Sequence, residues 1–295
     1  MKIVISVLAA IFLFAFGSAL QAKEFLRVKV LSKNTRPGDT VIIKLDSSYE
    51  IKEARVFTEF NRPAPCFNLD RQWYCVAGIP SAYSKKSIEL MFDVKTKEPY
   101  FLMIKEEISV GKKSFPKISW PSPWPLSGQA EARVFREKEM FKIKIENSST
   151  TFVPSGAFAL PLAKIKKVTS LFGERRVRPK PHLPRIHNGV DFRAKAGTPV
   201  YAPNDGVVEI SDDFYFEGGF ILLDHGGGIK SNFMHLSKLS VRTGDKVLRG
   251  QIIGYSGKTG AGISAPHLHF EIWVHDTPVD TFNFIKDFNK LIFKK

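Results

Sequence analysis

The C-terminal half of the chain, from about residue 155, consists of short β-prone segments separated by frequent glycines. GVVEIS, FILLDH and HLHFEIWV are examples of such segments, each of strand length. Glycines between them allow tight turns, and the only convincing amphipathic helix is the tail TFNFIKDFNKLIF. This pattern predicts a sheet-rich domain with many tight turns over residues 155–295.

The N-terminal half also favours strands, and a proline-rich segment separates the two halves. VIIKL, EARVF, WYCVAG, IELMFDV and YFLMIKEEISV are rich in β-branched and aromatic residues. They predict a small immunoglobulin-like β-sandwich over residues 23–113. FPKISWPSPWPLSG predicts an extended, semi-rigid connector, in which Trp120 and Trp124 could pack on a domain. We expect residues 114–154 to hold this connector and a bridging strand pair, RVFREKEM and FKIKIEN.

Residues 1–22 have the pattern of a secretory signal peptide. Lys2 precedes a mostly apolar run that ends at Phe16, and small residues follow, so cleavage is expected after Ala19 or Ala22. An uncleaved membrane anchor is the alternative, although a bilayer span needs roughly 20 apolar residues. We therefore expect an exported mature protein, periplasmic or secreted, that is not integral to a membrane.

Cys66 and Cys75 are the two cysteines of the chain. In an exported protein an isolated pair at this spacing predicts a disulfide, which would stabilise the fold by roughly 2–3 kcal/mol. A zinc site is the rival interpretation, but two cysteines alone cannot complete one.

The formal net charge is +15. A basic protein can bind nucleic acid, but export argues against that partner and favours anionic polymers of the cell envelope. The basic residues are scattered along the chain, so the charge could also serve solubility alone.

All seven histidines lie in the C-terminal half, and four of them occupy three patterned segments. In IHNGVDF, His187 and Asp191 are four positions apart, so an extended strand would place both side chains on one face. In PHLHFEIW, His267 and His269 share one face of a predicted strand, opposite its apolar residues. In NFMHL, His235 stands alone among apolar residues, the usual setting of a core histidine.

Together these residues fit one chemistry. Two neutral imidazoles and one carboxylate make a three-ligand zinc site with an open position for water, the design of a catalytic zinc. Zinc lowers the pKa of bound water toward roughly 7 and polarises a carbonyl under attack. A further histidine beside the metal can move protons or stabilise an oxyanion. The sequence contains no H-E-x-x-H segment, which excludes the common helical zinc-peptidase design.

The segments HNGVDF and APHLHFE resemble those of the lysostaphin-like (LytM-type) zinc metallopeptidases that act on peptidoglycan. SLFGERR, FMHL, GTPVYAPNDGVV, LDHGGG and VLRGQIIGYSGKTG extend the resemblance over residues 155–285. The resemblance implies that His187, Asp191 and His269 are zinc ligands, and that His235 and His267 are catalytic. It also implies a compact, mostly antiparallel β fold of the duplicated hybrid motif type, with a narrow groove.

Two features depart from the usual pattern of this family. Phe233 stands where the family commonly has a tyrosine, two positions before the histidine that matches His235. The stretch from Thr259 to His267 is one residue longer than usual, with Ala265 where glycine is frequent. Both departures are expected in the groove wall, where they bear on specificity more than on metal binding.

The other candidate residues have weaker patterns. His182 lies in a proline-rich loop and His225 at a turn. His275 is too far along its strand to bind the same ion as His267 and His269. Three arginines could either meet carboxylates of a stem peptide or lie in a solvated loop: Arg175, Arg176 and Arg178.

The sequence therefore predicts an exported zinc metalloendopeptidase that hydrolyses peptide cross-links of bacterial peptidoglycan. D-alanyl–diamino-acid bonds are favoured over glycine bridges, and a D,D-carboxypeptidase is an alternative within the enzyme class. A non-catalytic regulator or activator of another wall hydrolase would lack zinc ligands, whereas all three are present here. A basic wall-binding module would leave the histidines unexplained. We expect a monomer, with peptidoglycan as its partner, whose N-terminal region positions the enzyme or covers its groove.

Overall fold

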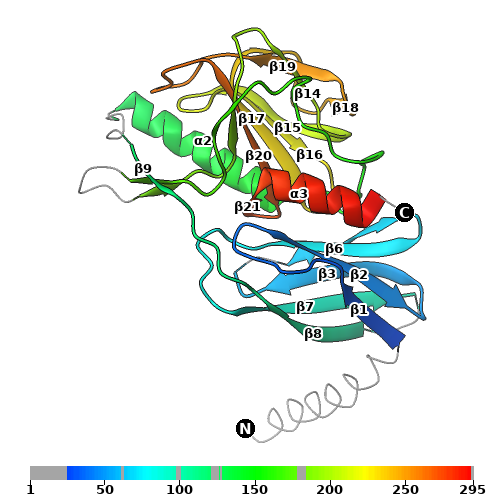
Figure 1. The fold of residues 1–295 in the computed structure, drawn as a ribbon. Helices are drawn as coiled ribbons and strands as arrows, with labels where there is room; N and C mark the ends of the chain where they lie inside the picture. Colours follow the sequence, from blue (N-terminus) through cyan, green and yellow to red (C-terminus); the bar gives the residue numbers. More distant parts are fainter. Residues whose placement is uncertain are drawn as a thin grey trace, which may run out of the picture.

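Figure 1 shows the computed structural model as two β-rich parts stacked on one another, with helix α2 along one side of the upper part. The structure describes residues 25–60, 63–97, 101–120, 126, 128–177 and 184–293. The expected signal peptide, residues 1–22, lies outside these ranges. Within them, no helix is long and apolar enough to cross a membrane.

The N-terminal part is a β-sandwich of two four-stranded sheets, as predicted. One sheet has the order β1-β2-β6-β5 and the other β4-β3-β7-β8, and neighbouring strands are antiparallel. Alternate residues of β7, such as Leu90 and Phe92, are fully buried, which is the pattern of a strand with one face on a core. The immunoglobulin type of the sandwich stays a prediction. The strands are β1 (Leu26–Val30), β2 (Thr40–Ser47), β3 (Ile51–Thr58), β4 (Ala64–Pro65), β5 (Phe67–Leu69), β6 (Gln72–Gly78), β7 (Ser87–Thr96) and β8 (Phe101–Ser109).

Cys66 and Cys75 form the predicted disulfide, which joins β6 to the segment between β4 and β5. Both cysteines are buried in the core that the two sheets of the sandwich share. Because the disulfide consumes both thiols, the rival zinc interpretation is excluded.

The C-terminal part is built on one ten-stranded antiparallel sheet. Its main path is β10-β13-β20-β17-β16-β15-β18, with β19 and β14 attached through β17 and β21 attached to β20. PVYAP, GVVEIS, FILLDH, IKSNFMHL, QIIGYS and HLHFEIWV all form strands, as predicted. The strands are β10 (Val168–Ser170), β13 (Val190–Arg193), β14 (Pro199–Tyr201), β15 (Gly206–Phe214), β16 (Gly218–Asp224), β17 (Ile229–Leu239), β18 (Lys246–Val247), β19 (Ile252–Ser256), β20 (His267–Val274) and β21 (Thr277–Val279).

The central strands of this sheet are buried on both faces. On β16, Ile221 packs into the main core, whereas Phe220 packs into a smaller core beneath α2. On β20 the same alternation sends Phe270 into the main core and Trp273 toward α2. The two histidines of β20, His267 and His269, share the parity of Trp273, so the candidate site lies on the face that α2 partly covers.

Helix α2 (Gln129–Glu146) replaces the strand pair predicted for RVFREKEM and FKIKIEN. The strand prediction was wrong because it followed the local alternation in FKIKIEN. The whole segment lacks glycine and proline and is rich in Ala, Glu, Lys and Arg, which favour helix. Val134, Phe141 and Ile145 recur at helical spacing. Phe141 lies edge-on to Phe220 and Trp273, with ring centroids 5.9 and 5.3 Å apart, and holds the helix on the sheet.

The proline-rich connector packs on the C-terminal part. Its strand β9 (Lys117–Ser119) pairs in parallel with β11 (Arg175–Val177), which pairs antiparallel with β12 (Arg185–Ile186). The ring of Trp120 lies against the guanidinium of Arg176, with its centroid 4.1 Å from Cζ. Trp124 lies outside the described residues.

Helix α3 (Thr281–Phe288), which the tail sequence predicted, continues into the π-helical turn η1 (Asn289–Phe293), and both lie at the junction of the two parts (Figure 1). Phe67 of the sandwich stacks on Phe152, with ring centroids 4.1 Å apart, and also contacts Phe288. The main core of the C-terminal part includes Ile42 and Val76 of the sandwich. The two parts therefore share one continuous core.

Candidate metal centre and active site

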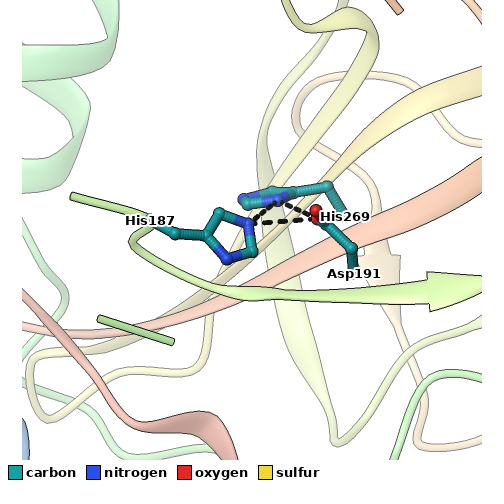
Figure 2. A group of neighbouring side chains, drawn as sticks. All are labelled: His187, Asp191 and His269. Atoms are coloured by element: carbon teal, nitrogen blue, oxygen red, sulfur yellow. Dashed lines mark hydrogen bonds and ion pairs between the residues drawn. The ribbon is translucent and has the colours of Figure 1, made fainter. Parts of the chain in front are cut away.

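His187, Asp191 and His269 converge on one point (Figure 2). The Nε2 atom of His187 lies 3.1 Å from Oδ1 of Asp191 and 3.0 Å from Nδ1 of His269, and the last two atoms are 2.7 Å apart. All three residues are buried. Among the described residues, these three form the one group of histidine, cysteine and acidic side chains with the geometry to hold a metal ion.

Strand register and a glycine bend bring the three residues together. Asp191 on β13 and His269 on β20 are directly paired neighbours in the sheet. The sequence interpretation placed His187 and Asp191 on one extended strand. In the structure they are on separate segments, because the chain bends between β12 and β13. A Cβ atom at Gly189 would lie 2.4 Å from the carbonyl oxygen of Phe270. Only glycine therefore lets the bend pass close enough to β20 to present His187.

The second nitrogen of each ligand histidine has an acceptor outside the cluster. Nδ1 of His187 lies 2.8 Å from the carbonyl oxygen of Leu171, and Nε2 of His269 lies 2.8 Å from Oε1 of Glu271. A carbonyl and a carboxylate only accept hydrogen bonds, so each of these nitrogens carries the proton. The opposite nitrogens face the cluster, and on losing their protons they would offer lone pairs to a metal ion, the arrangement found around protein-bound metals.

Asp191 is ionised in this setting. Burial opposes the charge, but with no metal bound the hydrogen bonds that His187 and His269 donate to it outweigh burial and hold the pKa of Asp191 well below its usual range. The second carboxylate oxygen, Oδ2, accepts a hydrogen bond from Nη2 of Arg176 at 3.1 Å. Two imidazole lone pairs and one carboxylate oxygen thus meet at a buried point. This donor set fits a borderline-soft divalent cation such as zinc.

His235 and His267 flank the cluster. The ring centroid of His235 lies 4.7 Å from that of His267 and 6.2 Å from that of His269. Nδ1 of His235 donates to the carbonyl oxygen of Thr259, and Nδ1 of His267 donates to that of Ala265. Within the part of the chain that the structure describes, Nε2 of neither ring forms a hydrogen bond, and Nε2 of His267 lies 3.9 Å from Oδ1 of Asp191. Burial, together with the nearby histidines, lowers the pKa of His235 to about 3, so its ring is neutral at ordinary pH.

A cavity of about 380 Å³ opens onto this cluster. Its lining includes His235, His267, Trp120 of the connector and the segment from Gly262 to Pro266. The lengthened stretch that contains Ala265 therefore lies in the cavity wall, as expected.

Phe233 does not lie in that wall, contrary to expectation. It is fully buried and stacks on Phe270 in the main core, with ring centroids 5.2 Å apart. The chain reverses its side-chain direction just after it, because His235 adopts a φ of 66° and its N–H donates to the carbonyl oxygen of Glu217. A tyrosine at position 233 would thus point its side chain toward the core, away from the cavity.

The other histidines with described positions lie outside the site, as predicted. His225 is fully buried, with Nδ1 donating to the carbonyl oxygen of Asp205 and Nε2 accepting from the hydroxyl of Ser231. His275 donates from Nε2 to the carbonyl oxygen of Val76, across the junction of the two parts. His182 and Arg178 lie outside the described residues.

Sequence reasoning missed two supporting residues. Glu271 also accepts hydrogen bonds from Nδ2 of Asn232 and Nε1 of Trp273, at 2.9 and 2.6 Å. Its position two residues after His269, on the same strand face, was the available signal. Arg176 was considered only for substrate or solvent, whereas it contacts Asp191. No sequence pattern pointed to that contact, since the two residues come from strands of different sheets.

A buried cluster of two imidazoles and a carboxylate, flanked by two further histidines on a β-sheet, is suited to holding a catalytic metal ion. Residues 185–281 match the model of Peptidase family M23. The chain is also similar to a crystal structure from Pseudomonas aeruginosa described under peptidase M23. The identity is 29%, the TM-score is 0.67, and the match covers 86% of this chain and 96% of the other. That similarity extends through the N-terminal part.

Two curated relatives carry activities in their names. Peptidoglycan DD-endopeptidase ShyA of Vibrio cholerae is 41% identical over 114 residues, which are 39% of this chain and 26% of ShyA. DD-carboxypeptidase/endopeptidase Mpg of Neisseria meningitidis is 34% identical over 125 residues, which are 42% of this chain and 28% of Mpg. The chain thus matches less than a third of the length of either relative.

Proposed function

We propose that this protein is an exported zinc metalloendopeptidase that hydrolyses D-alanyl–diamino-acid cross-links of bacterial peptidoglycan. The observation that carries the proposal is the convergence of His187 Nε2, Asp191 Oδ1 and His269 Nδ1, with His235 and His267 beside them in an open cavity. The names of the relatives ShyA and Mpg support peptidoglycan as the substrate.

His187, Asp191 and His269 would hold the zinc ion, and Glu271, Leu171 and Arg176 would fix their orientation. Bound zinc supplies a Lewis acid that lowers the pKa of a water toward roughly 7 and polarises the scissile carbonyl. His267 and His235, each anchored through Nδ1, present Nε2 to the substrate. Because Nδ1 already carries a proton, Nε2 of either ring can take up a proton from the attacking water and, while it holds that proton, donate a hydrogen bond to the developing oxyanion or release it to the leaving amine.

Independent features support export of the protein and a location in the cell envelope. The N-terminal 22 residues have the pattern of a signal peptide, and disulfides such as Cys66–Cys75 persist in oxidising compartments. A peptidoglycan substrate also lies outside the cytoplasm. We therefore place the mature protein in the cell envelope, with the sandwich, the connector and the metallopeptidase domain as its parts.

The test is digestion of purified cross-linked peptidoglycan by the mature, zinc-loaded protein, with the products read by mass spectrometry. We expect cross-linked dimers to fall to monomers, and a matched His267→Ala protein that retains zinc to release none. Failure of the intact protein to release monomers would contradict the proposal and favour a regulator of another wall hydrolase.

A D,D-carboxypeptidase is the second candidate, supported by the double activity in the name of Mpg. The same digestion separates the two activities. Loss of a terminal D-alanine from uncross-linked stems, with dimers intact, would identify the carboxypeptidase.

A further inference from the structure

A second cavity lies beside the metal cluster, between α2 and the sheet. Its volume is about 220 Å³, below the roughly 300–1,000 Å³ of sites that hold a whole small-molecule ligand. Its lining reaches Asn188, which follows His187, and Glu271, which contacts His269. This cavity therefore lies next to residues that adjoin the cluster, although it shares no lining residue with the cavity that opens onto it, and it has room for a single side chain of a bound peptide.

The walls of this cavity are mostly apolar. Phe141 of α2, Phe220 of β16, Met234 of β17 and Trp273 of β20 contribute to them. Met234 directly precedes His235, so the apolar walls begin at the catalytic face. Such walls favour the methylene groups of an aliphatic chain.

A carboxylate without a cationic partner faces this apolar cavity. Glu217, at the tip of the β15–β16 hairpin, lines the cavity and forms no ion pair among the residues that the structure describes. Burial raises the pKa of the Glu217 carboxyl, the effect expected of an acid that lacks a cation. Its backbone carbonyl accepts the N–H of His235 at 2.7 Å, which fixes Glu217 beside the active site.

The other acids of the cavity already have partners. The two oxygens of Glu271 accept from His269, Asn232 and Trp273. Glu137 pairs with Arg133 and accepts from the backbone N–H of Tyr215. Glu217 is thus the acid in this cavity with capacity to bind a cation from outside the protein.

We propose that this cavity binds the free ammonium-bearing side chain of the diamino-acid residue that precedes the D-alanine of the scissile bond, with Glu217 as its acceptor. In a D-alanyl–diamino-acid cross-link, the diamino acid that precedes the D-alanine keeps its side-chain amine unacylated. Its methylene groups fit the apolar walls and its ammonium fits Glu217. Lys138, exposed at the cavity on α2, provides a cation for a carboxylate on the same side chain. This assignment rests on the proposed function and names the specificity-determining residue of that site.

The test compares binding of two stem tripeptides to the zinc-loaded protein by calorimetry. One peptide ends in diaminopimelic acid with a free side-chain amine, and the other has that amine acetylated. A charge-assisted hydrogen bond is worth about tenfold or more in affinity, so we expect acetylation to weaken binding by at least about tenfold. Glu217→Gln should weaken binding of the free amine similarly and abolish the preference between the peptides. Glu139→Gln, the same change at an exposed position of α2, should leave both unchanged.

Equal binding of the two peptides by the unmodified protein would overturn the inference, as would failure to bind either. A Glu217→Gln protein that keeps the preference would also overturn it. Cleavage of dimers without dependence on the amine would leave the proposed function standing and remove only the role of this cavity. Amine-dependent binding without cleavage of any dimer would leave the role of this cavity standing and would remove the proposed function.

Discussion

At the level of single residues, His187 and His269 are each oriented by an acceptor that lies outside the proposed metal site. Glu271 orients His269, and its two oxygens accept three hydrogen bonds inside the protein. Hydrogen bonds with His269 and other donors outweigh burial and lower the pKa of Glu271. Its negative charge thus fixes the tautomer of His269 and increases the basicity of the nitrogen that faces the metal position.

Glu271→Gln should weaken zinc binding by about 10–100-fold, the usual effect of losing such an outer partner. Glutamine has one acceptor oxygen in place of two, so at least one of the three donors loses its partner. Competition with a chelator of known affinity measures the change. Glu107→Gln, an exposed position on β8, serves as control. A zinc affinity for Glu271→Gln within twofold of the unmodified protein would contradict this role.

Some features of the site could be predicted from the sequence and others could not. The five candidate residues could be recognised in the sequence because each belongs to a short local pattern on a strand or a bend. The structure brings all five close together. The orientation of Phe233 could not be predicted, since it depends on the irregular backbone at His235, where a non-glycine residue takes a positive φ. The contact between Arg176 and Asp191 likewise depends on how separate strands pack in three dimensions.

At the level of elements, strands were easier to predict than α2. Alternation of buried and more exposed residues along β7 is visible in the sequence and matches the burial of the folded chain. In α2 the alternating KIKIE segment suggested a strand, while helix propensity over the longer segment determined the structure. Tertiary contacts at both ends of α2 also stabilise the helix: Arg133 contacts Asp213, and Lys230 contacts the carbonyl oxygen of Lys144.

The C-terminal end of α2 is anchored by a buried lysine. Lys230 of β17 is fully buried, and its ammonium donates to the carbonyl oxygens of Lys144 and Asn147. Asp224 lies 3.9 Å from the same ammonium and also accepts from Ser148 and Ser149, just after the helix. The ammonium thus satisfies helix-terminal carbonyls that would otherwise be buried without a donor.

Lys230→Met should therefore release the C-terminal turn of α2 and destabilise the protein by about 3–5 kcal/mol, because Asp224 and two carbonyls lose their cation. Hydrogen exchange should show loss of protection in residues 129–146 before the strands of the large sheet. Lys246→Met, at an exposed position of β18, should change neither measurement. Unchanged protection of α2 in Lys230→Met would show that the lysine does not anchor the helix.

At the level of the whole molecule, the sandwich and the metallopeptidase domain are joined by a shared core. Ile42 and Val76 of the sandwich belong to the core of the C-terminal part, and His275 and Asn283 form hydrogen bonds across the junction. Within the described ranges, the walls of both cavities come from the connector, α2 and the C-terminal part. The sandwich therefore supports the domain from the side away from these cavities.

A shared core predicts one cooperative unfolding transition for the two parts. Phe67→Ala removes a buried ring that stacks on Phe152 at the junction and should destabilise the protein by about 3–5 kcal/mol. Calorimetry should show a single transition that moves as a whole to lower temperature. Phe135→Ala, at a ring that is 65% exposed, is the matched control. Two transitions, of which only one moves in Phe67→Ala, would contradict the shared core.

The measurement that most directly tests the central claim is the zinc content and the hydrolysis of cross-linked muropeptide dimers, followed in the same samples. We predict one zinc per chain in the unmodified protein, loss of hydrolysis when a chelator removes it, and recovery when zinc is restored. Asp191→Asn should bind zinc more weakly and lose hydrolysis in parallel. Dimer cleavage that persists in the metal-free protein, or in Asp191→Asn without bound zinc, would contradict the assignment of His187, Asp191 and His269 as the metal centre.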